Sequence, residues 1–359
     1  MIKVSGEDEL AELLRKRETP VFAQGGGTRR LGVALGEGID TSALAGVRIY
    51  EPGSLTLVAG AGTPLSEVEA VLAGERQRLA FEVPDLRGLL DRDGASTLGG
   101  VVAAGASGPR RVQVGACRDH VLGLRFVNGA GVVVKAGGRV MKNVTGLDLC
   151  KLLVGSHGAL AVITEVAFRV QAVPEAEVTL VGRRALAEGL AALRAALGAP
   201  YDVSGAAWQA GAAMIRVEGM EGSVAYRARA LRARLGGEWE MLESDASAAL
   251  WRGVRDVAAH AGRAGVVWRI SVKPSDAADV VSGLEGEALF DWGGGLIWLL
   301  TAPGVDVRAR VAGRGHATLM RGPGPGPVFH PGSVAVAALS RGIKEKFDPK
   351  GILGPGVLG

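Results

Sequence analysis

Gln24-Gly25-Gly26-Gly27-Thr28-Arg29 follows the short apolar run Val21-Phe22-Ala23, and this junction of a strand with a glycine loop decides the fold. Glycines have no Cβ and tolerate positive φ angles, so the N–H groups of consecutive glycines can converge on one anion. Thr28 adds a hydroxyl donor. Taken alone, the loop is as compatible with a plain turn as with a phosphate cradle, so other segments must decide between the two.

The spacing around this loop excludes two common nucleotide sites. The G-x-G-x-x-G fingerprint of dinucleotide-binding Rossmann domains is absent, and no acidic residue ends a second strand at the expected distance. No Gly-Lys-Ser/Thr follows the loop, as a P-loop would require. NAD and ATP are therefore not the expected ligands.

The composition indicates a folded chain without structural metals or disulfides. The chain has 359 residues, 48% of them hydrophobic, and is long enough for two domains of roughly 100–200 residues each. Its two cysteines, Cys117 and Cys150, form no C-x-x-C pair and have no metal-ligand spacing. We expect buried thiols in a reduced compartment and no metal site.

Charge and hydropathy argue against a nucleic-acid partner and against insertion into a membrane. The net charge is +4, and the arginines are scattered with few interleaved aromatic residues, which is not typical of a nucleic-acid surface. Residues 1–10 are polar and acidic, unlike a signal peptide. The apolar run 295–300 is shorter than the ~20 residues of a transmembrane helix. These patterns predict a soluble cytoplasmic protein without a transmembrane segment.

The first half of the chain predicts short strands joined by glycine-rich turns. Strands are expected at 21–23, 55–59, 121–127, 132–136 and 159–170. Asn128-Gly129-Ala130-Gly131 is a strong hairpin signal. A helix is expected over 7–17, and another begins with Thr63 as N-cap and Pro64 as its first residue.

The pattern changes near Val173-Pro174. From there to about Gly262, helices rich in alanine, leucine and arginine are expected to dominate, most clearly over 185–197 and 225–235. Strands return at 265–272 and 295–301. Beyond a Gly-Pro linker at 322–327, an amphipathic helix is expected over 334–347. The expected class is α+β.

Three segments in order resemble the FAD-contacting segments of the vanillyl-alcohol oxidase and p-cresol methylhydroxylase superfamily: Gly25–Thr28, Thr97–Gly100 and Gly155–Glu165. In that superfamily the first loop wraps the pyrophosphate, the second segment lines the diphosphate and flavin ring, and the third supplies backbone contacts. The resemblance implies a two-lobed p-cresol methylhydroxylase-type FAD-binding domain with an α+β cap domain. The FAD contacts it implies are Gly25, Gly26, Gly27, Thr28, Arg29, Thr97, Gly99, Gly100, Ala104, Ser107, Gly158 and Ile163.

The implied domain boundaries follow the change of pattern. Residues 1–171 would form the FAD-binding domain, built of two α/β lobes. Residues 172–333 would form the cap domain. Residues 334–359 would form a C-terminal helix and tail that return to the FAD domain.

Further runs narrow the resemblance to the glycolate oxidases. Lys142–Asp148 looks like the Lys-Asn-Val-x-Gly-Tyr-Asp run of their flavin subunits, with Leu147 in place of the tyrosine. The runs that look like the E subunit of glycolate oxidase are 107–111, 118–123, 268–272, 291–294 and 316–321. The E-subunit resemblance implies assembly with a D-type flavin subunit and an iron–sulfur subunit. In that case the partner subunits would provide any contact with the inner face of the membrane.

Departures from the family pattern limit what can be carried over. Some relatives bind flavin covalently through a histidine in the first loop, where this chain has Thr28-Arg29-Arg30, so non-covalent FAD is expected. The His-x-Gly-Asp-Gly-Asn-x-His signature of the D-type subunits is absent. The tail run Leu353–Gly356 also has glycine where the family usually has asparagine. The missing signature favours electron relay or a supporting role over substrate oxidation by this chain.

Oxidation of a 2-hydroxy acid requires a base for the hydroxyl proton and a cation for the carboxylate. His316 is the best candidate for the base, and Arg269 or Arg321 for the cation. All three could equally organise the second domain or a subunit interface, so no catalytic residue is assigned.

The leading function is thus an FAD-binding subunit of a complex that oxidises glycolate to glyoxylate. One alternative is a self-sufficient FAD-dependent dehydrogenase for a 2-hydroxy acid. The other is a structural subunit that has lost FAD.

Overall fold

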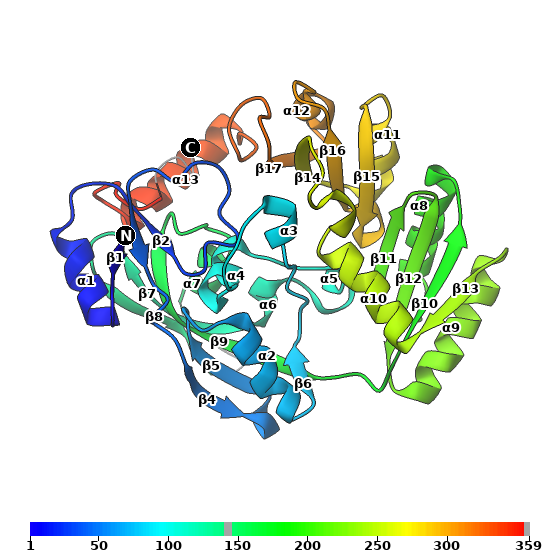
Figure 1. The fold of residues 1–359 in the computed structure, drawn as a ribbon, viewed down its shortest axis with the longest axis horizontal. Coiled ribbons are helices and arrows are strands. Elements are labelled where there is room, and N and C mark those ends of the chain that lie inside the picture. The colour runs from blue at the N-terminus through cyan, green and yellow to red at the C-terminus, as the bar shows by residue number, and fades with distance from the viewer. Residues whose placement is uncertain (140–145, 355–359) are drawn as a thin grey trace.

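The computed structural model describes residues 1–139 and 146–354, and its strands form three sheets (Figure 1). The first half of the chain builds a three-stranded and a six-stranded sheet, and the second half builds an eight-stranded sheet beside them. Residues 142–145 of the run quoted above, and Gly356, lie outside the described residues.

The three-stranded sheet carries the glycine loop. It is parallel, in the order β1-β3-β2, with β1 at Ile2–Lys3, β2 at Val21–Gln24 and β3 at Glu37–Asp40. Helix α1, Glu7–Lys16, buries Leu10 and Leu14 in the core of this lobe. Because β2 ends at Gln24, the loop leaves the carboxyl end of a buried strand.

The six-stranded sheet is antiparallel and follows the order β4-β5-β9-β7-β8, with β6 paired to β9. Its strands are β4 Val47–Glu51, β5 Thr56–Gly60, β6 Gln77–Leu79, β7 Val121–Asn128, β8 Val133–Gly137 and β9 Ala161–Ala172. The hairpin prediction is confirmed: β7 pairs with β8, and Asn128 Oδ1 accepts hydrogen bonds from the N–H groups of Ala130 and Val132. Leu57, Phe126 and Phe168 centre the core.

Helices of different lengths pack against all three sheets. The remaining helices are α2 Leu65–Gly74, α3 Arg87–Leu90, α4 Leu98–Ala104, α5 Arg111–Val114, α6 Cys117–His120, α7 Leu149–Leu153, α8 Leu186–Leu197, α9 Glu221–Leu235, α10 Ser244–Arg255, α11 Ala277–Val281, α12 Val307–Val311 and α13 Val334–Phe347. Short 3-10 turns occupy Pro52–Ser54, Ala258–His260, Pro274–Asp276 and Trp292–Gly294. Within the described ranges, none of the helices has the length and apolarity needed to cross a membrane.

Thr63 is not the N-cap of α2, contrary to the sequence prediction. The helix begins at Leu65, Pro64 takes the N-cap position, and no side chain caps it. The Thr63 hydroxyl instead donates to the Gly60 carbonyl (2.7 Å) and accepts from the Gly46 N–H (2.9 Å). Thr63 therefore closes the turn after β5.

The eight-stranded sheet follows the order β13-β10-β12-β11-β15-β16-β14-β17. Its strands are β10 Ala176–Arg183, β11 Val203–Gln209, β12 Ala212–Gly219, β13 Glu240–Glu243, β14 Val266–Val272, β15 Gly286–Asp291, β16 Leu296–Thr301 and β17 Gly315–Arg321. The helices predicted within 173–262 are present as α8 and α9, but the prediction missed strands β10 to β13, which lie in the same range. Their many Ala, Met, Glu and Arg residues favour helix locally, but burial between neighbouring strands outweighs that preference.

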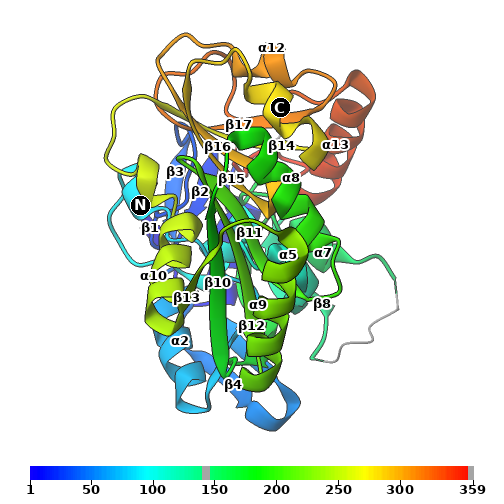
Figure 2. The same cartoon turned by 90° about the vertical axis from the view of Figure 1, so that its right-hand side faces the viewer.

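The two faces of this sheet have different roles. One face packs under α8, α9, α11 and α12, and Val266, Trp268 and Ile270 of β14 point into that core. The alternate residues, such as Val267, point to the opposite face with residues of α3 and α10. Figure 2 shows α8 and α9 on one side of β10–β12 and α10 on the other. The second face is therefore the one turned towards the first half of the chain.

Helix α13 brings the chain back beside the first sheet (Figure 1), and its bounds confirm the predicted helix. The Asp348 carboxylate accepts from the N–H groups of Ile352 and Leu353 and from Lys344 Nζ. This turn places Leu353 in a parallel bridge with Val21 of β2. The last described residues therefore lie beside β2, the strand that leads into the glycine loop.

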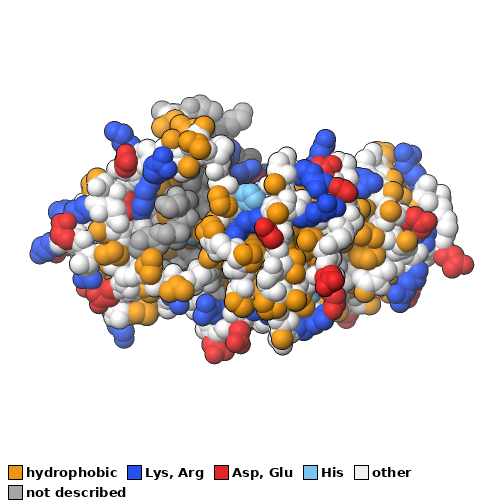
Figure 3. Space-filling model, turned by 90° about the horizontal axis from the view of Figure 1, so that it is seen from above, with side chains coloured by type: hydrophobic (Ala, Val, Ile, Leu, Met, Phe, Trp, Pro, Cys, Tyr) orange, Lys and Arg blue, Asp and Glu red, His pale blue; other side chains and the backbone are white. Residues whose placement is uncertain are grey.

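Charges of both signs are interspersed on the face seen in Figure 3. Lysine and arginine side chains alternate there with acidic and apolar ones, and they form no continuous basic field on that face. The pattern matches the modest net charge of +4.

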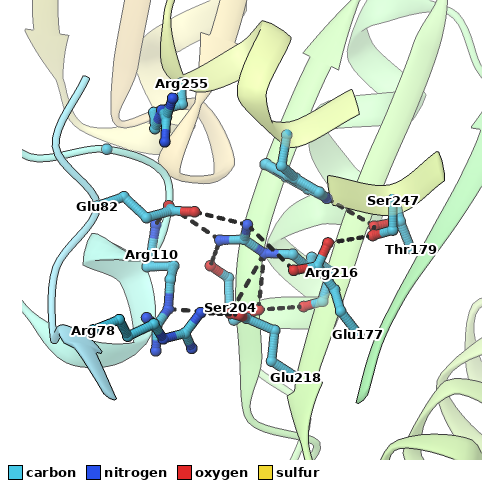
Figure 4. Close-up of polar contacts among 12 residues, drawn as sticks. Arg78, Glu82, Arg110, Glu177, Thr179, Ser204, Arg216, Glu218, Ser247 and Arg255 are labelled. Carbon is cyan, nitrogen blue, oxygen red and sulfur yellow. Dashed lines mark hydrogen bonds and ion pairs between the residues drawn. The ribbon is translucent and has the colours of Figure 1, made fainter. Parts of the chain in front are cut away.

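Buried ion pairs join the two halves of the chain (Figure 4). Arg216 of β12 donates through both terminal nitrogens to Glu82, which follows β6, at 2.8 and 3.1 Å. The guanidinium also donates to the hydroxyl and carbonyl oxygens of Ser204 on β11. Bidentate pairs of this kind fix orientation as well as distance.

Glu218 extends the network two residues along the same face of β12. Its carboxylate receives Arg78 at 2.9 Å and Arg110 at 3.1 Å, both from the first half of the chain. Arg110, Arg216 and Glu218 are 1%, 2% and 3% exposed. Charges from both halves therefore neutralise one another inside the protein.

Glu218→Gln is expected to lower the free energy of unfolding at pH 7 by about 3–5 kcal/mol, because buried guanidinium groups would lose their counter-charge. Burial alone would raise the pKa of Glu218, but the charges of Arg216, Arg110 and Arg78 outweigh it and lower the pKa from 4.5 to about 2. Since the folded pKa lies below the unfolded one, this contribution is full above about pH 4.5 and is lost as the pH falls towards 2. Urea denaturation at pH 7 and pH 3 measures both effects.

Glu12→Gln is the matched control. Glu12 forms an ion pair with Lys16 on the surface, where the two side chains are 61% and 75% exposed. Its loss is expected to change stability very little, because an exposed ion pair is screened by solvent. Equal losses from the two substitutions, or a Glu218→Gln effect that grows on acidification, would contradict the role given to the network.

Candidate functional site

Two adjoining cavities run from the glycine loop to the eight-stranded sheet. The loop cavity, about 850 Å³, is lined by residues 22–31, residues 33–35, Thr97, Gly100, Ala103, Ala104, His157, Phe329 and Gly354. The sheet cavity, about 1000 Å³, is lined by Arg29, Leu31, Pro84, Leu86, residues 104–107, Arg111, Ala116, Arg118, Val154, Gly155, His157, Arg269, Trp298, Thr318, Met320 and Phe329. Five residues line both, so the cavities form one elongated space.

The glycine loop packs directly on residues 94–97. A Cβ on Gly25 would overlap Thr97 Oγ1, and a Cβ on Gly26 would collide with the Ala95 carbonyl oxygen. Gly27 has a φ of +70°, in the left-handed region that side chains rarely adopt. All three positions therefore exclude side chains, and the backbone of the loop is left as the wall of the loop cavity.

Arg29 supports the loop from within. It is 7% exposed and donates to the Pro84 carbonyl and to Ser96 Oγ, both at 2.6 Å, and to Thr28 Oγ1 at 3.2 Å. Its Nε has no hydrogen-bond partner among the described residues. Burial lowers the pKa of Arg29 to about 10, so the guanidinium keeps its charge at neutral pH. Its positive charge thus faces both cavities.

Most of the residues implied as FAD contacts lie along the two cavities. Those that line them are Gly25, Gly26, Gly27, Thr28, Arg29, Thr97, Gly100, Ala104 and Ser107. Neither lining includes Gly99, Gly158 or Ile163. Gly99 packs against Ala61, where a Cβ would come within 2.8 Å of that methyl group. Ile163 is buried in the core of the six-stranded sheet.

The sheet cavity is cationic. Arg111, Arg118 and Arg269 line it with Arg29, and its lining among the described residues includes no aspartate or glutamate. Burial, and next the nearby charge of Arg111, lowers the pKa of Arg269 to about 10, which still leaves it charged. No described residue accepts a hydrogen bond from the side chain of Arg269 or pairs with it. A bound anion would accept hydrogen bonds from this side chain.

The three candidates for catalysis lie in different surroundings. Arg269 faces the sheet cavity. The Arg321 guanidinium is engaged by the carbonyl oxygens of Leu89, His260 and Arg263 and so ties α3 to the eight-stranded sheet. His316 lies on β17 with Thr318 and Met320 but lies outside both linings. Arg269 is thus the candidate with free donors at the cavity.

His157 is the histidine that reaches both cavities. Its ring packs on Phe329 with centroids 5.0 Å apart, and its φ is +51°. Burial, helped by the charge of Arg269, lowers the pKa of His157 to about 4. The imidazole is therefore neutral at pH 7 and a weak proton acceptor. Within residues 1–139 and 146–354, no cluster of His, Cys, Asp or Glu could hold a metal ion.

Several lining residues were not recognised as site residues from the sequence. Arg111 and Arg118 lie within runs that resemble the E subunit, and Trp298 lies in a predicted strand. Phe329 comes from the segment after the Gly-Pro linker, which carries no local motif. The shared basic character of 110–118 was the available signal, but their position relative to β14 depends on the tertiary fold.

The sequence is similar to the glycolate oxidase subunit GlcE of Escherichia coli. The two are 37% identical over 345 residues, which cover 94% of this chain and 92% of that subunit. The chain belongs to the GlcE family.

Two further similarities support an FAD-binding fold in this GlcE-family chain. Residues 1–137 match the family model for an FAD binding domain. The solved structure of an alkyldihydroxyacetonephosphate synthase superposes with a TM-score of 0.69 at 14% identity, over 98% of this chain and 76% of that one. The prediction of a p-cresol methylhydroxylase-type FAD-binding domain within an α+β fold is confirmed.

A D-lactate dehydrogenase of Archaeoglobus fulgidus is similar over part of the chain. It is 33% identical over 178 residues, which cover 47% of this chain and 38% of that enzyme. This similarity is more limited in extent than that to GlcE.

FAD is the cofactor of the GlcE-family chain, and the site residues fit it. The dinucleotide is long and carries a pyrophosphate, and the joined cavities are elongated, with a side-chain-free loop at one end. The unpartnered Nε of Arg29 and the excess of arginine at the other end suit an anionic ligand.

Gly26→Ala is expected to abolish FAD binding, because the added methyl group would displace the loop from the Ala95 carbonyl. FAD content of the purified variant, measured by flavin absorbance after denaturation, should fall at least tenfold, while circular dichroism shows a folded chain.

Gly222→Ala is the matched control. Gly222 lies in α9 with open space around its Cα, so the substitution should stabilise the helix by about 0.5–1 kcal/mol and keep FAD. Full FAD content in Gly26→Ala would refute the proposed need for a side-chain-free loop.

Proposed function

We propose that this chain is the FAD-binding subunit of a glycolate oxidase complex, which oxidises glycolate to glyoxylate. The observation that carries the proposal is that a side-chain-free glycine loop and a cationic pocket whose lining contains no carboxylate lie along one space. A small carboxylate fits the second feature, and family membership supports glycolate as that carboxylate.

The chain's own residues would divide the work along this space. The backbone of Gly25–Gly27 and the Thr28 hydroxyl would hold the pyrophosphate of a non-covalently bound FAD. Bound FAD supplies a hydride acceptor. Arg269 would bind a small carboxylate in the sheet cavity, and Trp298, Met320 and Phe329 would exclude water from it.

The proposed domains correspond to the separately built cores of the two halves of the chain. Residues 1–171 would be the FAD-binding domain, 172–333 the cap domain, and 334–359 the helix and tail that return to the first domain. Ion pairs of Glu82 and Glu218 support the first boundary, since they cross between two separately built cores.

Electron relay is favoured over independent oxidation of substrate. The linings of both cavities contain, within the described residues, one histidine and no carboxylate, and burial keeps that histidine a weak base. A D-type flavin subunit and an iron–sulfur subunit would be the electron partners. The chain would be cytoplasmic, with the partner subunits providing any contact with the membrane.

The exposed face of α13 supports assembly with such partners. Val336, Leu339 and Ile343 follow one another at helical spacing and are 54%, 71% and 37% exposed. Exposed apolar stripes of this kind typically become buried in protein interfaces.

The function is tested by purifying the chain alone and together with a D-type flavin subunit and an iron–sulfur subunit from the same organism. We expect stoichiometric FAD that acid denaturation releases, and rapid reduction of this flavin by glycolate only in the assembled complex. Rapid reduction in the isolated chain would establish a self-sufficient dehydrogenase. Absence of FAD, with none taken up when FAD is added, would leave a structural subunit.

Arg269→Gln is expected to weaken anion binding next to the flavin. Loss of a charged hydrogen-bond donor costs about 1.5–3 kcal/mol, which corresponds to roughly a 10–150-fold higher Kd. Oxalate, titrated into the FAD-loaded chain and followed by the change in flavin absorbance, measures this Kd. Arg183→Gln is the control, since Arg183 is exposed at the end of β10 and lines neither cavity. Equal Kd values for Arg269→Gln and the unchanged chain would remove Arg269 from the site.

A further inference from the structure

Trp292 lies in an unusual turn at the end of β15. Its φ is +54°, and Gly293 and Gly294 follow with φ values of +65° and +104°. The left-handed region is rare for a bulky residue and costs free energy unless the surroundings impose it. Here the buried carboxylate of Asp291 accepts the Trp292 N–H at 2.7 Å. The turn therefore holds the indole in one direction.

The indole is also held at its far end. Trp292 Nε1 donates to the Gly108 carbonyl at 3.1 Å, across the boundary between the two halves of the chain. The N–H of Gly108 donates in turn to the Glu82 carbonyl at 2.8 Å. Trp292 is thus fixed both to the eight-stranded sheet and to the loop before α5.

Two guanidinium groups of the sheet cavity lie against this one indole. Arg111 Cζ is 4.5 Å from the ring centroid, and Arg269 Cζ is 5.4 Å from it. Arg111 comes from the first half of the chain, and Arg269 comes from β14. Two like charges repel each other, and the π face of the indole offsets part of that repulsion.

Three other arginines that lie on tryptophan faces have hydrogen-bond partners within the protein. Arg184 on Trp239 and Arg308 on Trp268 also donate to backbone carbonyl oxygens nearby. Arg216 on Trp251 pairs with Glu82. The donors of those three arginines are therefore engaged by the protein itself.

Arg111 and Arg269 keep their donors free. Within residues 1–139 and 146–354, neither side chain donates a hydrogen bond or forms an ion pair. Both line the sheet cavity, whereas Trp292 lies outside that lining and supports them from behind.

We propose that Trp292 is a positioning residue that holds Arg111 and Arg269 as a two-guanidinium clamp for a carboxylate in the sheet cavity. The inference rests on the proposed anion site, and it adds the second arginine and the residue that aligns the pair. One guanidinium comes from each half of the chain, so the clamp is complete only when the two halves are held together.

The test titrates oxalate into the FAD-loaded chain carrying tryptophan, tyrosine, phenylalanine or leucine at position 292. Cation–π attraction is strongest for tryptophan. We expect Kd to stay within about threefold for Trp292→Tyr, to rise further for Trp292→Phe, and to rise about tenfold for Trp292→Leu, a loss comparable to two cation–π contacts. If Trp292→Leu does not fold, the aromatic variants still give the order. A flat or reversed order would overturn the proposal.

Trp239→Leu is the matched control, because Trp239 also carries an arginine on its face but lies away from the cavities. Its oxalate Kd should be unchanged.

In an Arg111→Gln/Arg269→Gln background, Trp292→Leu should have no further effect on the oxalate Kd, and an additive effect would overturn the positioning role. If the unchanged chain binds oxalate but the variants at 292 match it, this inference fails and the proposed anion site stands. If the FAD-loaded unchanged chain does not bind oxalate, the anion site and the clamp both fail, whereas FAD content reports on the cofactor site separately.

Discussion

The paired guanidinium of Arg216 and carboxylate of Glu82 constrain the rest of the structure. An apolar contact between the two halves of the chain could slide, but a buried bidentate pair has one geometry. Desolvation offsets much of its attraction, so its main contribution here is orientation. Glu218, two residues along β12, forms further ion pairs with Arg110 and Arg78, and the two points together fix both the position and the angle of the eight-stranded sheet.

The functional space depends on this alignment. The loop cavity belongs to the first half of the chain, whereas Arg269, Trp298, Thr318 and Met320 reach the sheet cavity from the second half. Glu82 takes part in both arrangements, because its carboxylate holds Arg216 and its carbonyl accepts from Gly108, the residue on which Trp292 rests. The same segment thus joins the halves and supports the cationic pocket.

Features set by local sequence could be predicted from it. The glycine loop, the hairpin at Asn128–Gly131 and the helix 334–347 depend on spacing within short segments. Strands β11 and β12 could not be predicted, since many of their residues favour helix and become strands through pairing with distant partners. Strand β10 carries a local strand signal in its β-branched residues Val178, Thr179 and Val181. Thr63 has the residue type of an N-cap but is used in the turn after β5.

The same distinction applies to the site. Gly25, Gly26 and Gly27 were predicted as the anion loop, but the sequence does not show that Ala95 and Thr97 are what exclude their side chains. The sequence does identify Arg269 as a candidate cation for a carboxylate. Its pairing with Arg111 across one indole arises only where β14, β15 and α5 meet, and these lie far apart in the chain.

The bridge between Val21 and Leu353 determines the stage of biosynthesis at which the loop cavity can be completed. The Val21 N–H donates to the Ile352 carbonyl, and the Gly354 N–H donates to the Val21 carbonyl, at the start of the strand that leads into the glycine loop. Gly354 also lines the loop cavity. The segment that begins the site is therefore synthesised well before the segment that completes it. The complete lining of the loop cavity can consequently form only after Gly354 has been synthesised.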